Sequence, residues 1–261
     1  MKYLKGTIII FLVLNILIPL NSYAKKETIY SYFKDGNVKS ESTYKDGKLH
    51  GKFICYYSNG NVKEKGNFKN DLQHGVWQKW YDNGQTKSTS KYKNGALNGL
   101  YKSYSEDGTL MFVENYKNTN REGKWEYYYE SGALREIQYF ENHKKKGTWQ
   151  YFHENGNLQG EAIYIKSKKN GVWKEWYPNG IIKEETPYEN NLIEGVKKMY
   201  YESGSIKEEI TYVHSNKQGK WTSYHPNGKV HVKAEFTKTN TPYGIWEYFD
   251  EKGNLIKTEK Y

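Results

Sequence analysis

Apolar and aromatic residues recur along this chain with a period of 24 residues. One column is aromatic in every copy, and it comprises Tyr44, Phe68, Tyr92, Tyr116, Phe140, Tyr164, Tyr188, Tyr212, Phe236 and Tyr261. A mostly aliphatic column precedes it by six residues, from Val38 in the first copy to Leu255 in the last. Polar and charged residues fill most positions between these columns. Self-similarity at a fixed period of this length predicts a repeat architecture.

Two series of glycines share the same period. The first series is Gly36, Gly60, Gly84, Gly108, Gly132, Gly156, Gly180, Gly204, Gly228 and Gly253. The second series is Gly51, Gly75, Gly99, Gly123, Gly147, Gly171, Gly195, Gly219 and Gly244. Both series slip by one residue at their last step, which places a single inserted residue in the loop 237–243.

Two further aromatic columns follow the second glycine series. The column two residues after the glycine contains Trp77, Trp125, Trp149, Trp173, Trp221 and Trp246, which we interpret as structural aromatics of the repeat. The column five residues after the glycine runs from Tyr56 to Phe249 and is aromatic throughout. A single hairpin cannot bury this many rings, so neighbouring copies must stack.

Each unit has the pattern of a strand, a turn, a second strand and a loop. In one copy these segments are 171–177, Pro178-Asn179-Gly180, 182–188 and the polar loop 189–191. An Asn-Gly pair between two strands is a strong hairpin signal. The sequence therefore predicts an all-β fold, an elongated single-layer twisted antiparallel β-meander of about ten stacked hairpin repeats.

The spacing of the columns also bears on the two faces of this sheet. Ile182 and Tyr188 are an even number of residues apart, which predicts that they share one face of the second strand. Trp173 and Trp176 are three residues apart, which places them on opposite faces unless a bulge intervenes. The pattern alone leaves that second question open.

The first 24 residues differ from the rest of the chain. Lys2 and Lys5 precede an apolar run from Thr7 to Leu20, and small residues follow at Ser22 and Ala24. This pattern predicts a cleavable signal peptide over 1–24, followed by the repeat array over 25–261. A retained membrane anchor is the alternative, but the apolar run is shorter than the roughly 20 residues that a spanning helix needs. We therefore expect an exported protein, periplasmic or secreted, that is not an integral membrane protein after cleavage.

The charge of the chain narrows the choice of partners. The formal net charge is +10, and lysines and glutamates are interspersed along the chain. Two basic loops occupy the same place in adjacent copies, and their lysines form a candidate patch for an anionic partner: Lys144, Lys145, Lys146, Lys166, Lys168 and Lys169. A solvated loop edge is the alternative interpretation. For an exported protein we do not expect a nucleic-acid partner, and we expect a monomer.

The sequence contains no recognisable catalytic, metal or cofactor motif. The histidines lack metal-ligand spacing such as His-x-x-x-His. Carboxylates recur on the second strands, as at Glu184, Glu185, Glu208 and Glu209, but they alternate with lysines, so cross-strand ion pairs are expected. We therefore predict a non-catalytic protein with no catalytic residues, no metal and no cofactor.

The repeat resembles a known family. The segment Tyr56-Tyr57-Ser58-Asn59-Gly60-Asn61-Val62-Lys63-Glu64, followed by Gly75-Val76-Trp77, is similar to the bacterial variant of the MORN repeat. This resemblance implies an elongated, twisted β-sheet that contacts proteins or lipids. Some bacterial members of the family are antitoxin or immunity components, which suggests that role as one form of the expected function.

Together these features favour a repeat scaffold that mediates protein–protein interaction. The alternative is a module at the cell envelope that binds cell-wall glycan or anionic lipid head groups, because aromatic repeats of similar length also form glycan-binding arrays.

The signal-peptide interpretation predicts the first residue of the exported protein. Expression in a bacterial host and intact-mass measurement of the exported fraction should give a chain that begins at Lys25. Ala24→Arg should block processing, because the position before the cleavage site requires a small side chain. An exported wild-type protein that keeps residues 1–24 would contradict the prediction.

Overall fold

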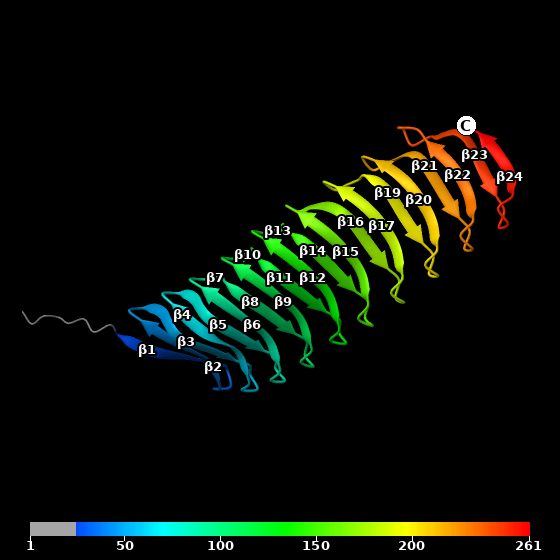
Figure 1. The fold of residues 1–261 in the computed structure, drawn as a ribbon. Coiled ribbons are helices and arrows are strands. Elements are labelled where there is room, and N and C mark those ends of the chain that lie inside the picture. The colour runs from blue at the N-terminus through cyan, green and yellow to red at the C-terminus, as the bar shows by residue number, and fades with distance from the viewer. Residues whose placement is uncertain (1–24) are drawn as a thin grey trace, which may run out of the picture.

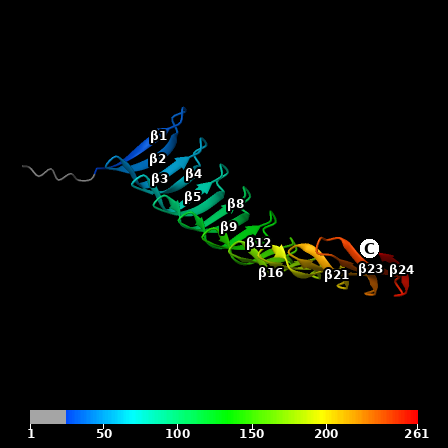
Figure 2. The same ribbon diagram turned by 90° about the horizontal axis from the view of Figure 1, so that it is seen from above.

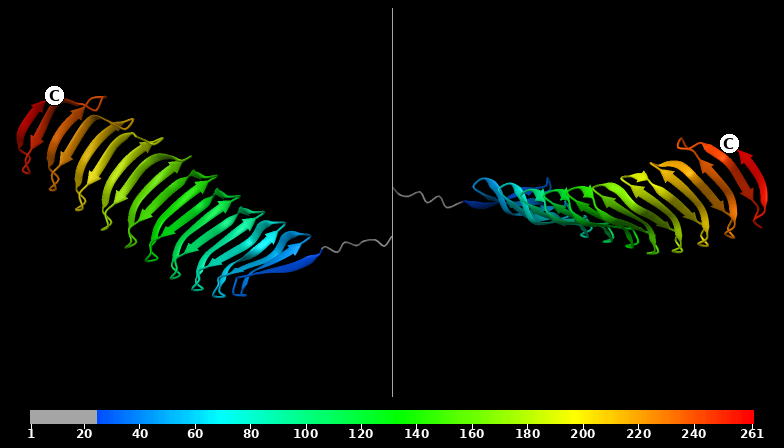
Figure 3. Two further views of the ribbon diagram at one scale, coloured as in Figure 1. Left: turned by 180° about the vertical axis from the view of Figure 1, so that it is seen from behind. Right: turned by 45° about the horizontal axis from the view of Figure 1, so that its top comes forward.

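The computed structural model describes residues 25–261, and they form one long antiparallel sheet. The predicted signal peptide lies outside the described residues. Within 25–261 there is no helix, and the strands lie side by side in an extended ribbon with the two ends far apart (Figure 1). The ribbon twists along its length, so the strand direction rotates from the first repeats to the last (Figures 2 and 3).

The described residues contain 24 strands. Their bounds are β1 Lys26–Tyr32, β2 Val38–Lys45, β3 Lys48–Tyr56, β4 Val62–Lys69, β5 Leu72–Trp80, β6 Thr86–Lys93, β7 Ala96–Leu97, β8 Gly99–Tyr104, β9 Leu110–Lys117, β10 Asn120–Arg121, β11 Gly123–Tyr128 and β12 Leu134–Glu141. The others are β13 Lys144–Lys145, β14 Gly147–Phe152, β15 Leu158–Ile165, β16 Lys168–Trp176, β17 Ile182–Glu189, β18 Leu192–Ile193, β19 Gly195–Tyr200, β20 Ile206–Val213, β21 Asn216–Tyr224, β22 Val230–Phe236, β23 Pro242–Phe249 and β24 Leu255–Lys260.

The long strands pair in chain order, which confirms the predicted meander of hairpins. β16 pairs with β15 and β17, for example, and both pairs are antiparallel. The short strands β7, β10, β13 and β18 are the first two residues of a longer strand that is interrupted just before its second-series glycine. Each copy of the repeat therefore contributes two strands.

The two edges of the ribbon use different turns. At the turn edge, only the glycine of Asn179-Gly180 has a positive φ, and the Gly180 N–H donates to the Tyr177 carbonyl at 2.9 Å. At the loop edge, both central residues have positive φ, 51° at Asn190 and 76° at Asn191. Two such residues define the type I′ turn that matches strand twist. The polar loop is thus the tighter of the two connections.

One extra residue in each second strand decides which side chains share a face. Glu175 pairs with Glu184, whereas Trp176 pairs with Ile182, so Lys183 is the additional residue of a β-bulge. The first strand of the repeat has no extra residue between Trp173 and Trp176. These two aromatic columns therefore lie on opposite faces of the sheet.

The same bulge overturns the expectation that the aliphatic and closing aromatic columns share a face. Tyr188 pairs with Gly171 on the side that carries Trp173, whereas Ile182 pairs with Trp176 on the other side. Although Ile182 and Tyr188 are an even number of residues apart, they lie on opposite faces, because the bulged residue shifts the alternation of side chains by one position.

Most of the burial occurs on one face, which we call the tryptophan face because it carries Trp77, Trp125, Trp149, Trp173, Trp221 and Trp246. The buried residues on this face are Trp77, Ser88, Ser90, Trp125, Phe140, Trp149, Ala162, Tyr164, Thr186, Ile210, Val232 and Ala234. The opposite face has Thr43 and Ile54. Of the predicted structural tryptophans, three are buried and the other three are half-buried.

Gly66 and Gly160 both lie on second strands of the tryptophan face, but their surroundings differ. A Cβ atom added to Gly66 would overlap the indole ring of Trp77. A Cβ atom added to Gly160 would meet its nearest atom, Tyr151 Cδ2, at 3.6 Å, which is an ordinary contact. Neither glycine has a positive φ.

The two glycines provide a matched test of packing on this face. Gly66→Ala should lower the free energy of unfolding by about 1–3 kcal/mol, because the indole of Trp77 must move out of a well-packed site. Gly160→Ala should leave it unchanged or slightly raised, because a strand residue with a side chain loses less backbone entropy than glycine. Urea unfolding followed by tryptophan fluorescence measures both, and equal losses in the two variants would contradict this account.

Candidate functional site

In the middle of the tryptophan face, aromatic rings form a continuous row from Tyr116 to Tyr164. In the centre of the array the ring centroids of Trp125 and Phe140 are 5.0 Å apart, those of Phe140 and Trp149 5.2 Å, and those of Trp149 and Tyr164 5.0 Å. Phe140 thus contacts the tryptophan of its own repeat and that of the next, and Phe236 does the same with Trp221 and Trp246. The distances fall in the range where tilted and edge-on ring pairs are favourable.

Cationic side chains lie over the tryptophan rings of three successive repeats. Lys145 Nζ lies 4.2 Å from the ring centroid of Trp149, and Lys169 Nζ lies 3.3 Å from that of Trp173. One repeat earlier, the Arg121 guanidinium lies 5.0 Å from the Trp125 ring. These three residues occupy the same repeat position, two residues before the second-series glycine, and they form a row of cation–π contacts.

Burial lowers the pKa of the two lysines in this row. Desolvation lowers the pKa of Lys145, and the charge of Arg121 lowers it further. Desolvation likewise lowers the pKa of Lys169, and the charge of Lys145 adds to the effect. An anionic partner would relieve the repulsion between these neighbouring cations.

The structure divides the six lysines of the predicted patch between two locations. Lys145 and Lys169 lie half-buried on the tryptophan face, as described above. Lys144, Lys146, Lys166 and Lys168 are exposed at the loop edge in two adjacent repeats. Alternation along the strand separates the two groups, because consecutive side chains point to opposite faces.

The loop-edge lysines border a shallow hollow that is partly apolar. It is lined by Lys144, Lys145, Lys146, Lys166, Ile163, Tyr164 and Ile165, among others. Ile165 is 58% exposed, and Lys146 forms an ion pair with Glu141 at 3.1 Å. The patch therefore combines positive charge with exposed aliphatic surface.

The predicted cross-strand ion pairs are present. Glu184 pairs with Lys197 at 2.9 Å on the tryptophan face, and Glu209 pairs with Lys198 at 3.3 Å on the opposite face. Glu185 lies 3.9 Å from Lys174 and also accepts a hydrogen bond from the hydroxyl of Tyr200. These carboxylates are engaged in contacts between strands.

Glu208 differs from the other three carboxylates. It has no lysine partner and instead accepts a hydrogen bond from the indole Nε1 of Trp221. A side chain on a second strand thereby satisfies the polar atom of the tryptophan in the next repeat.

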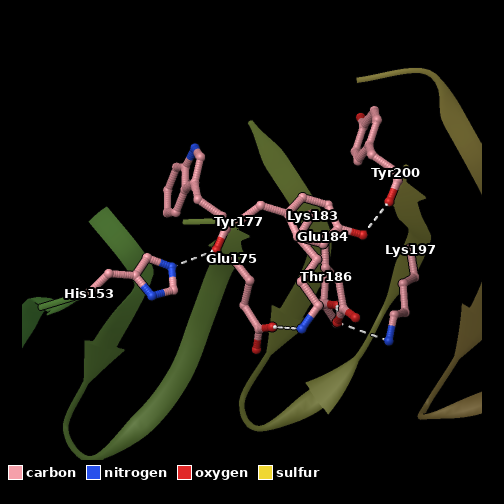
Figure 4. A network of polar contacts seen from close by, with 9 residues as sticks. His153, Glu175, Tyr177, Lys183, Glu184, Thr186, Lys197 and Tyr200 are labelled. Atoms are coloured by element: carbon pink, nitrogen blue, oxygen red, sulfur yellow. Dashed lines mark hydrogen bonds and ion pairs between the residues drawn. The ribbon is translucent and has the colours of Figure 1, made fainter. Parts of the chain in front are cut away.

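A ladder of hydrogen bonds joins successive repeats at the turn edge, and the sequence patterns above do not predict it. The hydroxyl of Tyr177 donates to the carbonyl of Tyr200 at 2.9 Å (Figure 4). Tyr57 and Tyr81 make the same bond to the repeats that follow them. A histidine replaces the tyrosine in two copies, with His153 Nε2 lying 3.1 Å from the Trp176 carbonyl and His225 Nε2 lying 2.9 Å from the Phe249 carbonyl. The recurrence of Tyr or His three residues before the first-series glycine is the signal that could have revealed it.

Residues 25–261 contain no group of three or more His, Cys, Asp or Glu side chains placed to hold a metal ion. No helix in this part of the chain is long and apolar enough to cross a membrane.

The fold defines an elongated β-hairpin repeat protein in which each unit is stabilised by its neighbours. Nine consecutive segments match the family described as the MORN repeat variant, at 28–46, 49–70, 73–94, 97–118, 121–142, 145–166, 169–190, 193–214 and 217–238. The chain therefore belongs to the MORN repeat variant family. Its repeats form a scaffold, and this confirms the family resemblance inferred from the glycine and aromatic columns.

Other comparisons add little. No curated protein matches the chain. A crystal structure of TcdB2-TccC3-Cdc42 is 11% identical with a TM-score of 0.21, covering 86% of this chain and 14% of that one. Virginiamycin B lyase from Staphylococcus aureus is 10% identical with a TM-score of 0.16, covering 91% of this chain and 88% of that one. The chain thus spans a small part of the first of these proteins, and neither likeness bears on function.

The tyrosines of the sheet predict how stability changes at alkaline pH. Burial raises the pKa of Tyr151 to about 12, and burial with the hydrogen bond to Glu185 raises that of Tyr200 to about 12. The unfolded tyrosines ionise near pH 10, so their contribution to stability is complete below pH 10 and is lost between pH 10 and 12. The urea midpoint should fall over this interval, and less steeply in Tyr151→Phe. A midpoint that stays constant or rises would contradict the assignment.

Proposed function

We propose that this chain is an exported, non-catalytic scaffold, periplasmic or secreted, that binds an acidic protein along its loop edge. The observation that carries the proposal is the arrangement of the basic patch. Exposed lysines in two adjacent repeats surround a partly apolar hollow, and half-buried cations lie directly beside it on the tryptophan face. Interfaces between proteins commonly combine an apolar centre with a charged rim.

The charge pattern along the loop edge favours a protein over a lipid surface. The last residue of each second strand is Lys45, Lys69, Lys93 or Lys117 in the early repeats. The same position is Glu141 in one later repeat and Glu189 in another. A bilayer presents a uniform negative surface and would favour a uniformly basic edge. An edge whose charge changes sign between its early and later repeats fits a partner that has its own charge pattern.

The non-catalytic part of the proposal is supported by how the polar side chains are used. The carboxylates Glu184, Glu185 and Glu209 make ion pairs, and the ring nitrogens of His153 and His225 lie within hydrogen-bond distance of backbone carbonyls.

Family membership is compatible with an immunity or antitoxin-type role, in which the acidic partner would be a secreted toxin. Cell-wall glycan or anionic lipid head groups are the competing ligands for the loop edge.

A charge-reversal pair tests this proposal. Lys144→Glu, Lys166→Glu and Lys168→Glu together should weaken binding of the acidic protein about tenfold, if three rim contacts contribute roughly 0.5 kcal/mol each. Lys34→Glu, Lys229→Glu and Lys252→Glu change the net charge equally at exposed turn-edge positions and should leave binding intact. The measurement is retention of periplasmic or secreted proteins on the immobilised array, with the captured protein identified by mass spectrometry and its affinity determined by titration.

Two parallel incubations distinguish the competing ligands. Any retention of the array on phosphatidylglycerol vesicles or on purified peptidoglycan should be the same in the wild type and in the loop-edge triple variant, because the loop edge does not bind these ligands. Retention that is lost in the loop-edge triple variant with no captured protein, or equal loss of protein binding in both triple variants, would overturn the proposal.

A further inference from the structure

A hollow on the tryptophan face interrupts the regular surface of the repeats. It has a volume of about 430 Å³ and is lined by Tyr151, Gln159, Gly160, Trp173, Glu175 and Lys183, together with residues of the adjoining turns. Its size falls in the range of pockets that take small molecules. It lies in the repeats next to the turn edge, away from the loop-edge lysines.

The hollow lies where one repeat position has no side chain. Four residues after the first-series glycine, four copies carry a glutamate, namely Glu64, Glu136, Glu184 and Glu208, and five others carry Ser40, Ser88, Phe112, Val232 and Lys257. Gly160 occupies this position in the sixth copy. Its φ is not in the left-handed region, and a Cβ atom would fit, so backbone geometry does not require glycine there.

The tryptophan that faces this position has an unpartnered N–H group. Glu208 accepts the indole N–H of Trp221, which lies thirteen residues later in the chain. Gly160 and Trp173 have the same relation, and the buried Nε1 of Trp173 has no hydrogen-bond partner. That nitrogen lies 3.9 Å from the Cβ position of Gly160, so it borders the space that a glutamate would fill.

The other repeats show that this orphaned donor is unusual. The indole N–H groups of Trp77, Trp125 and Trp149 each donate to a backbone carbonyl of the preceding strand, at 3.2, 2.9 and 3.1 Å. Trp246 also lacks a partner, but the equivalent position there is the buried side chain of Val232. Only the copy with Gly160, among the described repeats, combines a free indole donor with a glycine at that position.

The remaining polar groups of the hollow provide both donors and acceptors. Lys183, the bulged residue, lies 3.5 Å from Glu175, and the two side chains meet at the rim (Figure 4). Gln159 is the bulged residue of the neighbouring repeat and adds an amide. The aromatic surfaces of Tyr151 and Trp173 form the walls. The hollow is therefore neutral overall, aromatic on its walls and rich in hydrogen-bonding groups at its rim.

We propose that this hollow binds one pyranose ring of a neutral glycan. A pyranose presents a flat C–H face that can pack on an aromatic ring, and hydroxyls that both donate and accept. The ring would pack against Trp173 beside its unpartnered Nε1, and its hydroxyls would contact Glu175, Lys183 and Gln159. The charges of Glu175 and Lys183 offset each other, so the hollow offers no net positive charge to a carboxylate and a neutral polyol is the better match.

This inference does not depend on the proposed protein partner, because the hollow lies next to the turn edge and none of the loop-edge lysines lines it. The direct test titrates the ¹⁵N-labelled array, residues 25–261, with maltotriose and with chitotriose. The indole Nε1 signal of Trp173, assigned with Trp173→Phe, should shift with a dissociation constant in the millimolar range for at least one of the two. The indole signals of Trp77 and Trp125, which donate to backbone carbonyls, should not shift.

Two reciprocal variants separate this site from other effects. Gly160→Glu supplies the side chain found in other repeats, so it should fill the hollow, satisfy Trp173 and abolish the shift while the protein stays folded. Glu208→Gly removes the partner of Trp221 and should create a second responsive indole signal. Circular dichroism and thermal unfolding confirm that both variants are folded.

Three results would overturn the inference. The first is no shift of the Trp173 signal with either sugar up to 50 mM, a limit about fiftyfold above a dissociation constant of roughly 1 mM. The second is a shift that persists in Gly160→Glu. The third is a stronger response to acetate or to a glutamate-containing peptide than to either sugar, which would assign the hollow to an acidic side chain of a protein partner.

Discussion

A sheet one layer thick has no second layer against which to bury its side chains, and this constraint governs the whole molecule. The buried surface of each hairpin comes from the hairpins on either side of it. The ring of Phe140 lies between those of Trp125 and Trp149, in contact with both, and Phe236 lies in the same way between Trp221 and Trp246. Large rings suit this arrangement because each buries much area at small entropic cost. Stability is therefore shared between neighbours.

The edges of the ribbon strengthen the same coupling. At the turn edge, the Tyr177 hydroxyl reaches the next repeat, and at the loop edge the Asn191 side chain accepts the backbone N–H of Lys169 from the preceding one. Aromatic contacts and both edges together hold each repeat to its neighbours at three places across its width. Positions whose side chains take no part in these contacts between repeats are available to bind a ligand. The exposed loop-edge lysines and the hollow at Gly160 are two such positions.

Much of this architecture follows from the sequence, because the repeat period, the hairpins, the aromatic columns and the ion pairs all depend on local pattern. The β-bulge at Lys183 does not follow, since no residue type marks it and its effect is to move Ile182 to the other face. The division of the six patch lysines also required the strand alternation seen in the structure. The hollow depends on what Gly160 lacks, and a missing side chain gains meaning only once Trp173 is placed beside it.

The dependence of each repeat on its neighbours is most directly tested by hydrogen exchange in the wild-type array and in Phe140→Ala. Phe140 lies on β12, between the tryptophans of β11 and β14. Loss of its ring should reduce amide protection on both of those strands and leave the distant strands β3 and β21 nearly unchanged. Loss of protection confined to β12, or spread equally over the whole array, would contradict the account.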